Sequence, residues 1–206
     1  MGGWYRFGYI TSQIIAKTLF SFKVVHRERI IEEGGAILAM NHESYLDPPL
    51  AGIACKRELF YLARKTLRDW PILGPILPDL NVIPVDQDRA DMSALKTVIK
   101  HVRAGEATVI FPEGSRTLDG ELQPAQPGLG LVIAKTMAPV VPMRIFGAHR
   151  AFPRGGKPRP FTPITLVVGE PIFFTKEEMT GSGREHYQRL SERVMERIAA
   201  IKYERP

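Results

Sequence analysis

The segment AILAMNHESYLD, residues 36–47, joins an apolar run to a dense polar loop and indicates the architecture of the chain. Five consecutive apolar residues, Ala36 to Met40, are typical of a strand buried on both faces of a sheet. The run stops at Asn41-His42, and a helix is predicted to begin near Ser44 or Asp47. In open α/β sheets, ligands bind where strands end in such loops.

The rest of the chain repeats this alternation of short strands and helices. Strands are predicted at 59–62, 82–85, 108–111, 140–142 and 164–168. Apolar residues recur at helical spacing from Met92 to Val102, and again from Tyr187 to Ile201, where the pattern Ser182-x-x-Glu185 predicts a capping box. We therefore expect one α/β domain with a mixed, mostly parallel sheet flanked by helices.

The composition is that of a globular protein that needs neither disulfides nor a metal to fold. Of the 206 residues, 44% are hydrophobic and 24% are charged, and a chain of this length buries roughly 70% of its unfolded surface. The single cysteine, Cys55, excludes a disulfide framework and is expected to be a small core residue. No pair of histidines has metal-ligand spacing, so we expect no metal site and no bound cofactor.

The positive charge of the chain is concentrated in one stretch. The net charge is +6, and residues 122–169 contain six Lys or Arg residues and no acid. A local positive field favours an anionic partner, such as nucleic acid, lipid headgroups or a phosphorylated small molecule. Because neither a helix-turn-helix nor a base-stacking aromatic pattern is evident, a nucleic-acid partner is not expected.

Residues 1–23 are predicted to be an N-terminal membrane-interface helical segment, followed by a domain spanning residues 24–206. The segment is aromatic and apolar, yet it carries Arg6 and Lys17 and is too polar to span a bilayer. The alternative is a helix packed on the core of the domain itself. The first interpretation predicts a peripheral or monotopic protein on the cytoplasmic face of a membrane.

His42 and Asp47 are candidates for acid–base chemistry in the first polar loop, residues 41–47. A neutral imidazole can accept a proton at neutral pH, and a carboxylate on its other nitrogen fixes the tautomer. Five residues of separation allow the two side chains to meet. In the alternative interpretation, Asp47 only caps a helix that starts at Pro48.

A second polar loop, FPEGSRT at residues 111–117, follows the predicted strand 108–111. Gly114 allows close approach of the backbone, Glu113 supplies a carboxylate, and the planar guanidinium of Arg116 suits a phosphate.

NHESYLD and FPEGSRT together resemble the paired motifs of the glycerolipid acyltransferase family, whose best-known members are the 1-acylglycerol-3-phosphate (lysophosphatidate) acyltransferases. The likeness runs over residues 25–150 and includes three further short segments: Ala63-Arg64-Lys65, Ile83-Pro84-Val85-Asp86 and Val141-Pro142-Met143.

This resemblance implies transfer of a fatty acyl group from an acyl-CoA or acyl-carrier-protein thioester to the free hydroxyl of a lysophospholipid at a membrane surface. The acceptor implied first is 1-acylglycerol-3-phosphate, which would give phosphatidate. His42 would be the general base and Asp47 would orient it. The implied acceptor-binding residues are Glu113, Gly114, Ser115 and Arg116, with Lys65 and Arg116 as phosphate ligands.

The sequence departs from the family pattern at Gln87, where an arginine that contacts the acceptor phosphate is usual. Arg89 would point to the same side of an extended segment and is our candidate to replace it. This departure leaves open an acyltransferase with another acceptor, such as glycerol 3-phosphate or an amino-acid lysolipid. A membrane lipid-binding protein without turnover is the second alternative.

Overall fold

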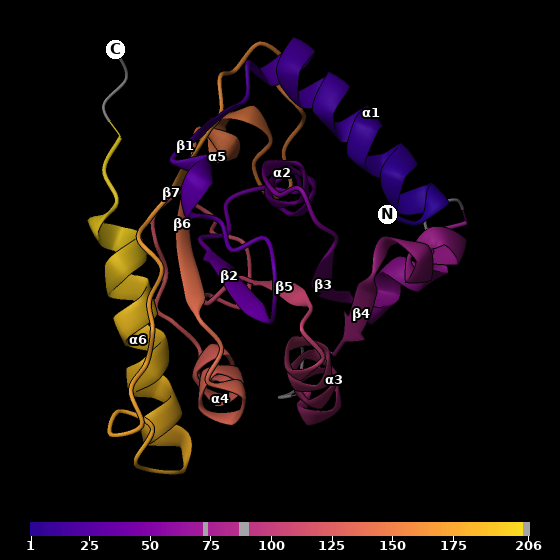
Figure 1. Cartoon of the computed structure of the whole chain (residues 1–206). Coiled ribbons are helices and arrows are strands. Elements are labelled where there is room, and N and C mark those ends of the chain that lie inside the picture. The colour runs from indigo at the N-terminus through magenta and orange to yellow at the C-terminus, as the bar shows by residue number, and fades with distance from the viewer. Residues whose placement is uncertain (72–73, 87–90, 204–206) are drawn as a thin grey trace.

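The chain folds as an α/β sandwich in which one sheet lies between two layers of helices (Figure 1). The computed structural model describes residues 1–71, 74–86 and 91–203, so the predictions for Gln87 and Arg89 lie outside the described residues. The strands are β1 (Lys23–Val25), β2 (Ala36–Met40), β3 (Leu59–Arg64), β4 (Val82–Val85), β5 (Ala107–Ile110), β6 (Val140–Phe146) and β7 (Thr165–Val168). The helices are α1 (Gly3–Phe20), α2 (Asp47–Ala54), α3 (Met92–Arg103), α4 (Pro127–Thr136), α5 (Ala148–Ala151) and α6 (Arg184–Ala200).

The strand order is β1-β7-β6-β2-β5-β3-β4. Within the described residues, the pairing of β6 with β7 is antiparallel and the other pairings are parallel. The predicted mixed, mostly parallel sheet flanked by helices is therefore confirmed. Short 3₁₀ turns, Lys65–Asp69, Gly74–Ile76 and Pro78–Leu80, lie between β3 and β4.

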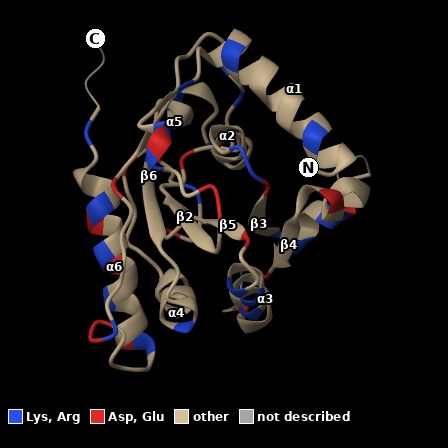
Figure 2. Cartoon of the chain, in the orientation of Figure 1, with Lys and Arg blue, Asp and Glu red and all other residues tan. Residues whose placement is uncertain are grey.

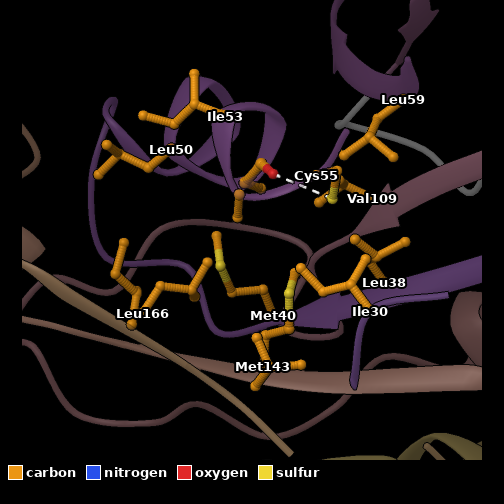
Figure 3. Packing of buried hydrophobic residues seen from close by; sticks show 14 of the residues in the cluster. Ile30, Leu38, Met40, Leu50, Ile53, Cys55, Leu59, Val109, Met143 and Leu166 are labelled. Atoms are coloured by element: carbon orange, nitrogen blue, oxygen red, sulfur yellow. Dashed lines mark hydrogen bonds between the residues drawn. The ribbon is translucent and has the colours of Figure 1, made fainter. Parts of the chain in front are cut away.

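The central strand β2 is buried on both faces, as its unbroken apolar run predicts. Side chains alternate across a strand, so Leu38 and Met40 face α1, α2 and α5, whereas Ile37 and Ala39 face α3, α4 and α6. Figure 3 shows the first of these two cores, where Met40 packs among residues of α2 and neighbouring strands.

Cys55 lies in this first core, as expected. Its Sγ donates a weak hydrogen bond to the Ala51 carbonyl over 3.5 Å (Figure 3). Burial raises the pKa of the thiol to about 12, so the cysteine stays protonated and acts as a small apolar side chain.

The parallel arrangement delivers the ends of four strands to one edge of the sheet. β2 pairs with β5 on one side and with β6 on the other, and β5 also pairs with β3. The segments that follow them begin at Asn41, Phe111, Gly147 and Lys65. This edge is where an open α/β sheet usually handles its ligands.

Helix α1 packs on the domain with one face and exposes an apolar surface with the other. Tyr5, Ala16 and Phe20 are buried, and the Tyr5 hydroxyl accepts a 2.9 Å hydrogen bond from the amide of Leu59. The exposed large apolar residues of α1 are Trp4, Phe7, Ile10, Ile14, Ile15 and Leu19. Its charged residues are Arg6 and Lys17, and most of the helix is tan in Figure 2.

The predicted capping box is wrong, whereas the helix predicted from Met92 is confirmed. Helix α6 begins at Arg184 with Gly183 at its N-cap and no capping side chain, so Ser182 and Glu185 do not form a capping box. In α3, Met92 is exposed, and the N-cap is Asp91, whose carboxylate accepts the amides of Ser93 and Ala94. Helix α3 therefore begins at Met92, where the predicted apolar stripe begins, although the Met92 side chain does not join the buried face.

Candidate active site

The two polar loops lie side by side because the strands that precede them are neighbours. Ala39 of β2 pairs with Ile110 of β5, so both chains leave the sheet at the same level. The amide of Thr117 donates to the His42 carbonyl at 2.9 Å, and the amide of His42 donates to Glu113 Oε1 at 3.1 Å. Two segments about 70 residues apart in sequence thus form one hydrogen-bonded unit.

His42 and Asp47 form the close pair that their spacing predicts. The Nδ1 of His42 lies 2.7 Å from Oδ2 of Asp47, and the imidazole stacks on the Phe111 ring at 3.9 Å between centroids. A carboxylate accepting from Nδ1–H leaves Nε2 as the acceptor nitrogen of a neutral ring. In the described part of the chain, Nε2 has no hydrogen-bond partner.

The Asp47 carboxylate is fully buried and holds the loop together. Its Oδ2 also accepts the amides of Glu43 at 2.6 Å and Ser44 at 2.7 Å. Because Asp47 is the first residue of α2 and bonds backward to the loop, with Leu46 at the N-cap, the carboxylate does not cap the helix. The interpretation of Asp47 as only a helix cap is therefore wrong.

A cavity of about 620 Å³ begins at His42 and runs beneath α1. Its mostly apolar lining comes from α1, α2, β3, the turns after β3 and the two polar loops. Tyr5 and Tyr61, whose hydroxyls are 3.1 Å apart, also line it. Because Tyr5 belongs to α1 and Tyr61 to β3, the cavity extends from the two polar loops to the side of α1 that faces the sheet.

Cationic residues also line the cavity. Arg64, Arg116 and Arg154 are among its lining residues, and the Arg116 guanidinium lies 3.5 Å from the centroid of the Tyr45 ring. Ser115 also lines the cavity, and Gly114 turns the loop with a φ of +74° that favours glycine.

The structure places Lys65 apart from the arginines that line the cavity. Its Nζ lies 3.8 Å from Asp86 and 3.5 Å from Asp91, and it does not line the cavity. Arg64, the last residue of β3, lines the cavity, whereas Lys65 begins the turn Lys65–Asp69 that follows the strand.

Comparison with known proteins agrees with this geometry. The sequence model of the acyltransferase family matches residues 21–146, which include both polar loops. The chain belongs to the acyltransferase family. The resemblance carried by NHESYLD and FPEGSRT is thereby confirmed.

Relatives of this acyltransferase include the 1-acyl-sn-glycerol-3-phosphate acyltransferase of Bacillus subtilis, with 28% identity over 82% of each chain. The chloroplastic 1-acyl-sn-glycerol-3-phosphate acyltransferase BAT2 of Brassica napus is 25% identical over 69% of this chain, which spans only 42% of that protein. The crystal structure of the 1-acyl-sn-glycerophosphate acyltransferase PlsC from Thermotoga maritima superposes with a TM-score of 0.69 at 25% identity. That match covers 98% of this chain and 80% of the other.

Several residues of the acyltransferase site were missed by the sequence analysis. Asn41 links β2 to β6, since its side chain accepts from the Ile145 amide at 2.8 Å and donates to the Ile145 carbonyl. Tyr45 and Arg154 were not singled out as site residues. Arg154 belongs to the acid-free stretch, and that charge pattern was the available signal.

Two buried carboxyl groups support the loops of the acyltransferase. Burial raises the pKa of Glu43 to about 7, although the amide of His149 donates to it. Burial likewise raises the pKa of Glu113 to about 7, against the opposing hydrogen bond from the His42 amide. Both groups therefore change charge near neutral pH.

The free energy of unfolding should depend on pH because of these two groups. A carboxyl whose pKa is about 4.5 when unfolded and about 7 when folded favours the folded state most below pH 4.5. This advantage is lost as pH rises from about 4.5 to about 7, by up to about 3 kcal/mol for a buried group. Urea unfolding at pH 5 and pH 8 should thus show that Glu113→Gln flattens the pH dependence. The exposed control Glu33→Gln should leave it unchanged, and an equal slope in all three proteins would contradict this assignment.

In residues 1–71, 74–86 and 91–203, no three His, Cys, Asp or Glu side chains gather closely enough to hold a metal ion. Within the same ranges, none of the helices has the length and hydropathy needed to cross a membrane.

Proposed function

We propose that this acyltransferase moves a fatty acyl group from an acyl-CoA or acyl-carrier-protein thioester to the free hydroxyl of 1-acylglycerol-3-phosphate, giving phosphatidate. The observation that carries the proposal is the His42–Asp47 pair beside a mostly apolar cavity that His42 lines together with three arginines. The names of the relatives support the same acceptor.

His42 Nε2 is the proposed general base. It would take the proton of the acceptor hydroxyl while that oxygen attacks the thioester carbonyl and forms the new C–O bond. When the tetrahedral intermediate collapses, the C–S bond breaks and the leaving thiolate takes the proton back from the imidazolium. The buried Asp47 carboxylate would hold the ring and stabilise its positive charge.

The cavity beneath α1 is suited to a fatty acyl chain. Ligand cavities of roughly 300–1,000 Å³ with apolar walls and a few convergent polar groups are typical binding sites, and this one has about 620 Å³. Leu62, Leu77 and Leu80 are among its apolar walls, whereas its polar lining includes His42 and Arg116.

Ala63→Phe should shift the chain-length preference toward shorter chains, because Ala63 lines the cavity on β3 and a phenyl ring would fill part of it. We expect kcat/KM for a 16-carbon chain to fall at least tenfold and that for an 8-carbon chain to change little. Assays that vary the donor chain and the acceptor chain separately will show which of them occupies the cavity. The control Ala104→Phe adds the same ring at an exposed position outside the cavity. Equal losses at all chain lengths would contradict this use of the cavity.

The exposed apolar face of α1 is proposed to bind the membrane surface, with the protein peripheral or monotopic on the cytoplasmic leaflet. Contiguous exposed apolar residues mark interaction sites on soluble folds. A helix of this kind buries its apolar face at the headgroup boundary. The anionic cytoplasmic leaflet also attracts basic residues such as those of the acid-free stretch. Because Tyr5 and Phe20 are buried, α1 is packed on the core as well as exposed to a partner.

Phe7→Glu should weaken binding to vesicles of phosphatidylglycerol and phosphatidylcholine about tenfold or more without unfolding the protein, because the side chain is 63% exposed. Co-sedimentation measures the binding and circular dichroism checks the fold. Phe173→Glu, at a 69% exposed position outside α1, is the matched control. If both variants bind vesicles like the parent protein, α1 is not the membrane contact.

The acceptor is tested directly by incubating the purified protein and a labelled acyl thioester with a panel of lysolipids. We expect lysophosphatidate to be acylated faster than lysophosphatidylcholine, an amino-acid lysolipid or glycerol 3-phosphate. Acyl-CoA and acyl-carrier protein are compared as donors in parallel. Preference for a zwitterionic or uncharged lysolipid would overturn the proposed acceptor while leaving acyl transfer in place.

A further inference from the structure

We propose that Arg154 binds the phosphate of the lysolipid acceptor together with Arg116, so that the segment of residues 147–159 forms part of the acceptor site. The proposal rests on the proposed function, because it names a further residue that recognises the same substrate. It goes beyond the two polar loops, since Arg154 follows β6 and belongs to neither of them.

Three guanidinium groups converge on the cavity around Tyr45. Arg64, Arg116 and Arg154 line the cavity together with this tyrosine. The pKa of the Tyr45 hydroxyl is lowered, first by its interaction with the Arg116 guanidinium and then by the charges of Arg154 and Arg64. The positive charges of the three arginines therefore act on the same place, the Tyr45 side chain on which Arg116 stacks.

The first polar loop itself sets the position of the 147–159 segment. The Ser44 hydroxyl donates to the Phe152 carbonyl at 2.8 Å, and the Phe152 ring packs against Tyr45 at 5.1 Å between centroids. The carboxylate of Glu43 accepts the amide of His149 at 3.0 Å. Three consecutive residues after His42 therefore hold this segment at His149 and Phe152, five and two residues before Arg154.

Donor groups remain available on the two arginines. Arg154 Nη1 donates to the Arg116 carbonyl at 3.4 Å, which brings the two residues together. Arg116 Nη1 is buried and has no hydrogen-bond partner within the described residues. Buried donors are normally satisfied, so an unpaired guanidinium nitrogen beside a cavity points to an anionic ligand.

A phosphate monoester matches this arrangement. Its charge of about −1.5 to −2 near neutral pH and its three oxygens suit planar guanidinium groups that donate in pairs. The stretch that carries Arg154 has no acidic residue from 122 to 169 to compete with such a ligand. The two nearby buried carboxyl groups, Asp47 and Glu113, each have one oxygen without a partner among the described residues, but neither side chain lines the cavity that the three arginines line.

The test compares lysophosphatidate with a 1-monoacylglycerol of the same chain, which has the same free hydroxyl but no phosphate. Arg154→Ala should lower kcat/KM for lysophosphatidate about tenfold, mainly by raising KM. The kcat/KM for monoacylglycerol and the KM of the acyl donor should stay unchanged. Arg154→Lys should recover part of the loss. Arg150→Ala removes an exposed charge of the same segment that does not line the cavity, and should match the parent protein.

Binding of glycerol 3-phosphate, measured by calorimetry, separates this proposal from the proposed function. We expect Arg154→Ala to weaken it about tenfold. If the parent enzyme fails to acylate lysophosphatidate but binds glycerol 3-phosphate through Arg154, the proposed function fails and the phosphate site stands. Equal losses with both acceptors, a raised KM for the donor alone, or glycerol 3-phosphate binding that does not depend on Arg154 would each overturn the phosphate site.

Discussion

Replacing His42 by alanine is expected to lower kcat by at least ~10²–10⁴-fold, the range that a positioned general base supplies. The loss should appear at saturating acceptor and donor, because the imidazole is needed for proton transfer more than for binding. Thermal unfolding should show a folded protein, since the ring contributes a stack on Phe111 and one hydrogen bond to Asp47.

The chain offers a matched control for this experiment in His101. Its Nδ1 lies 2.5 Å from Oε2 of Glu106, five residues later, and its ring stacks on Phe60 at 3.8 Å. This pair has the same spacing, the same kind of hydrogen bond and a similar ring stack as His42 and Asp47, but it does not line the cavity. His101→Ala should therefore keep full turnover. A folded His42→Ala enzyme with parent-like kcat would rule out the general-base mechanism.

Asp47→Asn should lower kcat by up to about 10⁴-fold, the loss known when the carboxylate of a serine-protease triad becomes an amide. An asparagine oxygen can still accept from His42 and from the amides of Glu43 and Ser44, so the loop should keep its shape. What disappears is the buried negative charge that stabilises the imidazolium formed during transfer.

Single-turnover assays measure the chemical step for Asp47→Asn, and near-ultraviolet circular dichroism checks the packing. Glu106→Gln also replaces a carboxylate by an amide, but in the His101–Glu106 pair, and should leave turnover unchanged. Lost turnover that comes with lost near-ultraviolet signal would assign Asp47 to folding alone. Parent-like turnover would show that its charge plays no part in the reaction.

The presence of two His–carboxylate pairs shows why local spacing is weak evidence for a catalytic site. Both pairs have five-residue separations and stacked rings. Only the pair at the carboxyl edge of the sheet adjoins the cavity, and the order of the strands decides which pair that is.

Patterns within short segments of the sequence were sufficient for most of the elements and for the two polar loops, although the short elements β1 and α5 were not predicted. The apolar run 36–40 indicated a doubly buried strand, and the sheet buries it on both faces. The spacing of His42 and Asp47 is local, so their contact follows from one loop and one helix start. The resemblance of the two loops to an acyltransferase family could also be recognised from the types and order of their residues alone.

The tertiary structure alone decided which distant residues share the site. Parallel pairing places the ends of β2, β3, β5 and β6 at one edge, and no local pattern encodes that register. It brings Arg64 and Arg154 to the cavity and turns Lys65 toward Asp86 and Asp91. Likewise, α1 both packs and remains exposed, because its apolar residues are not confined to one face, and the domain covers only the side that packs against α2 and the turn Pro78–Leu80.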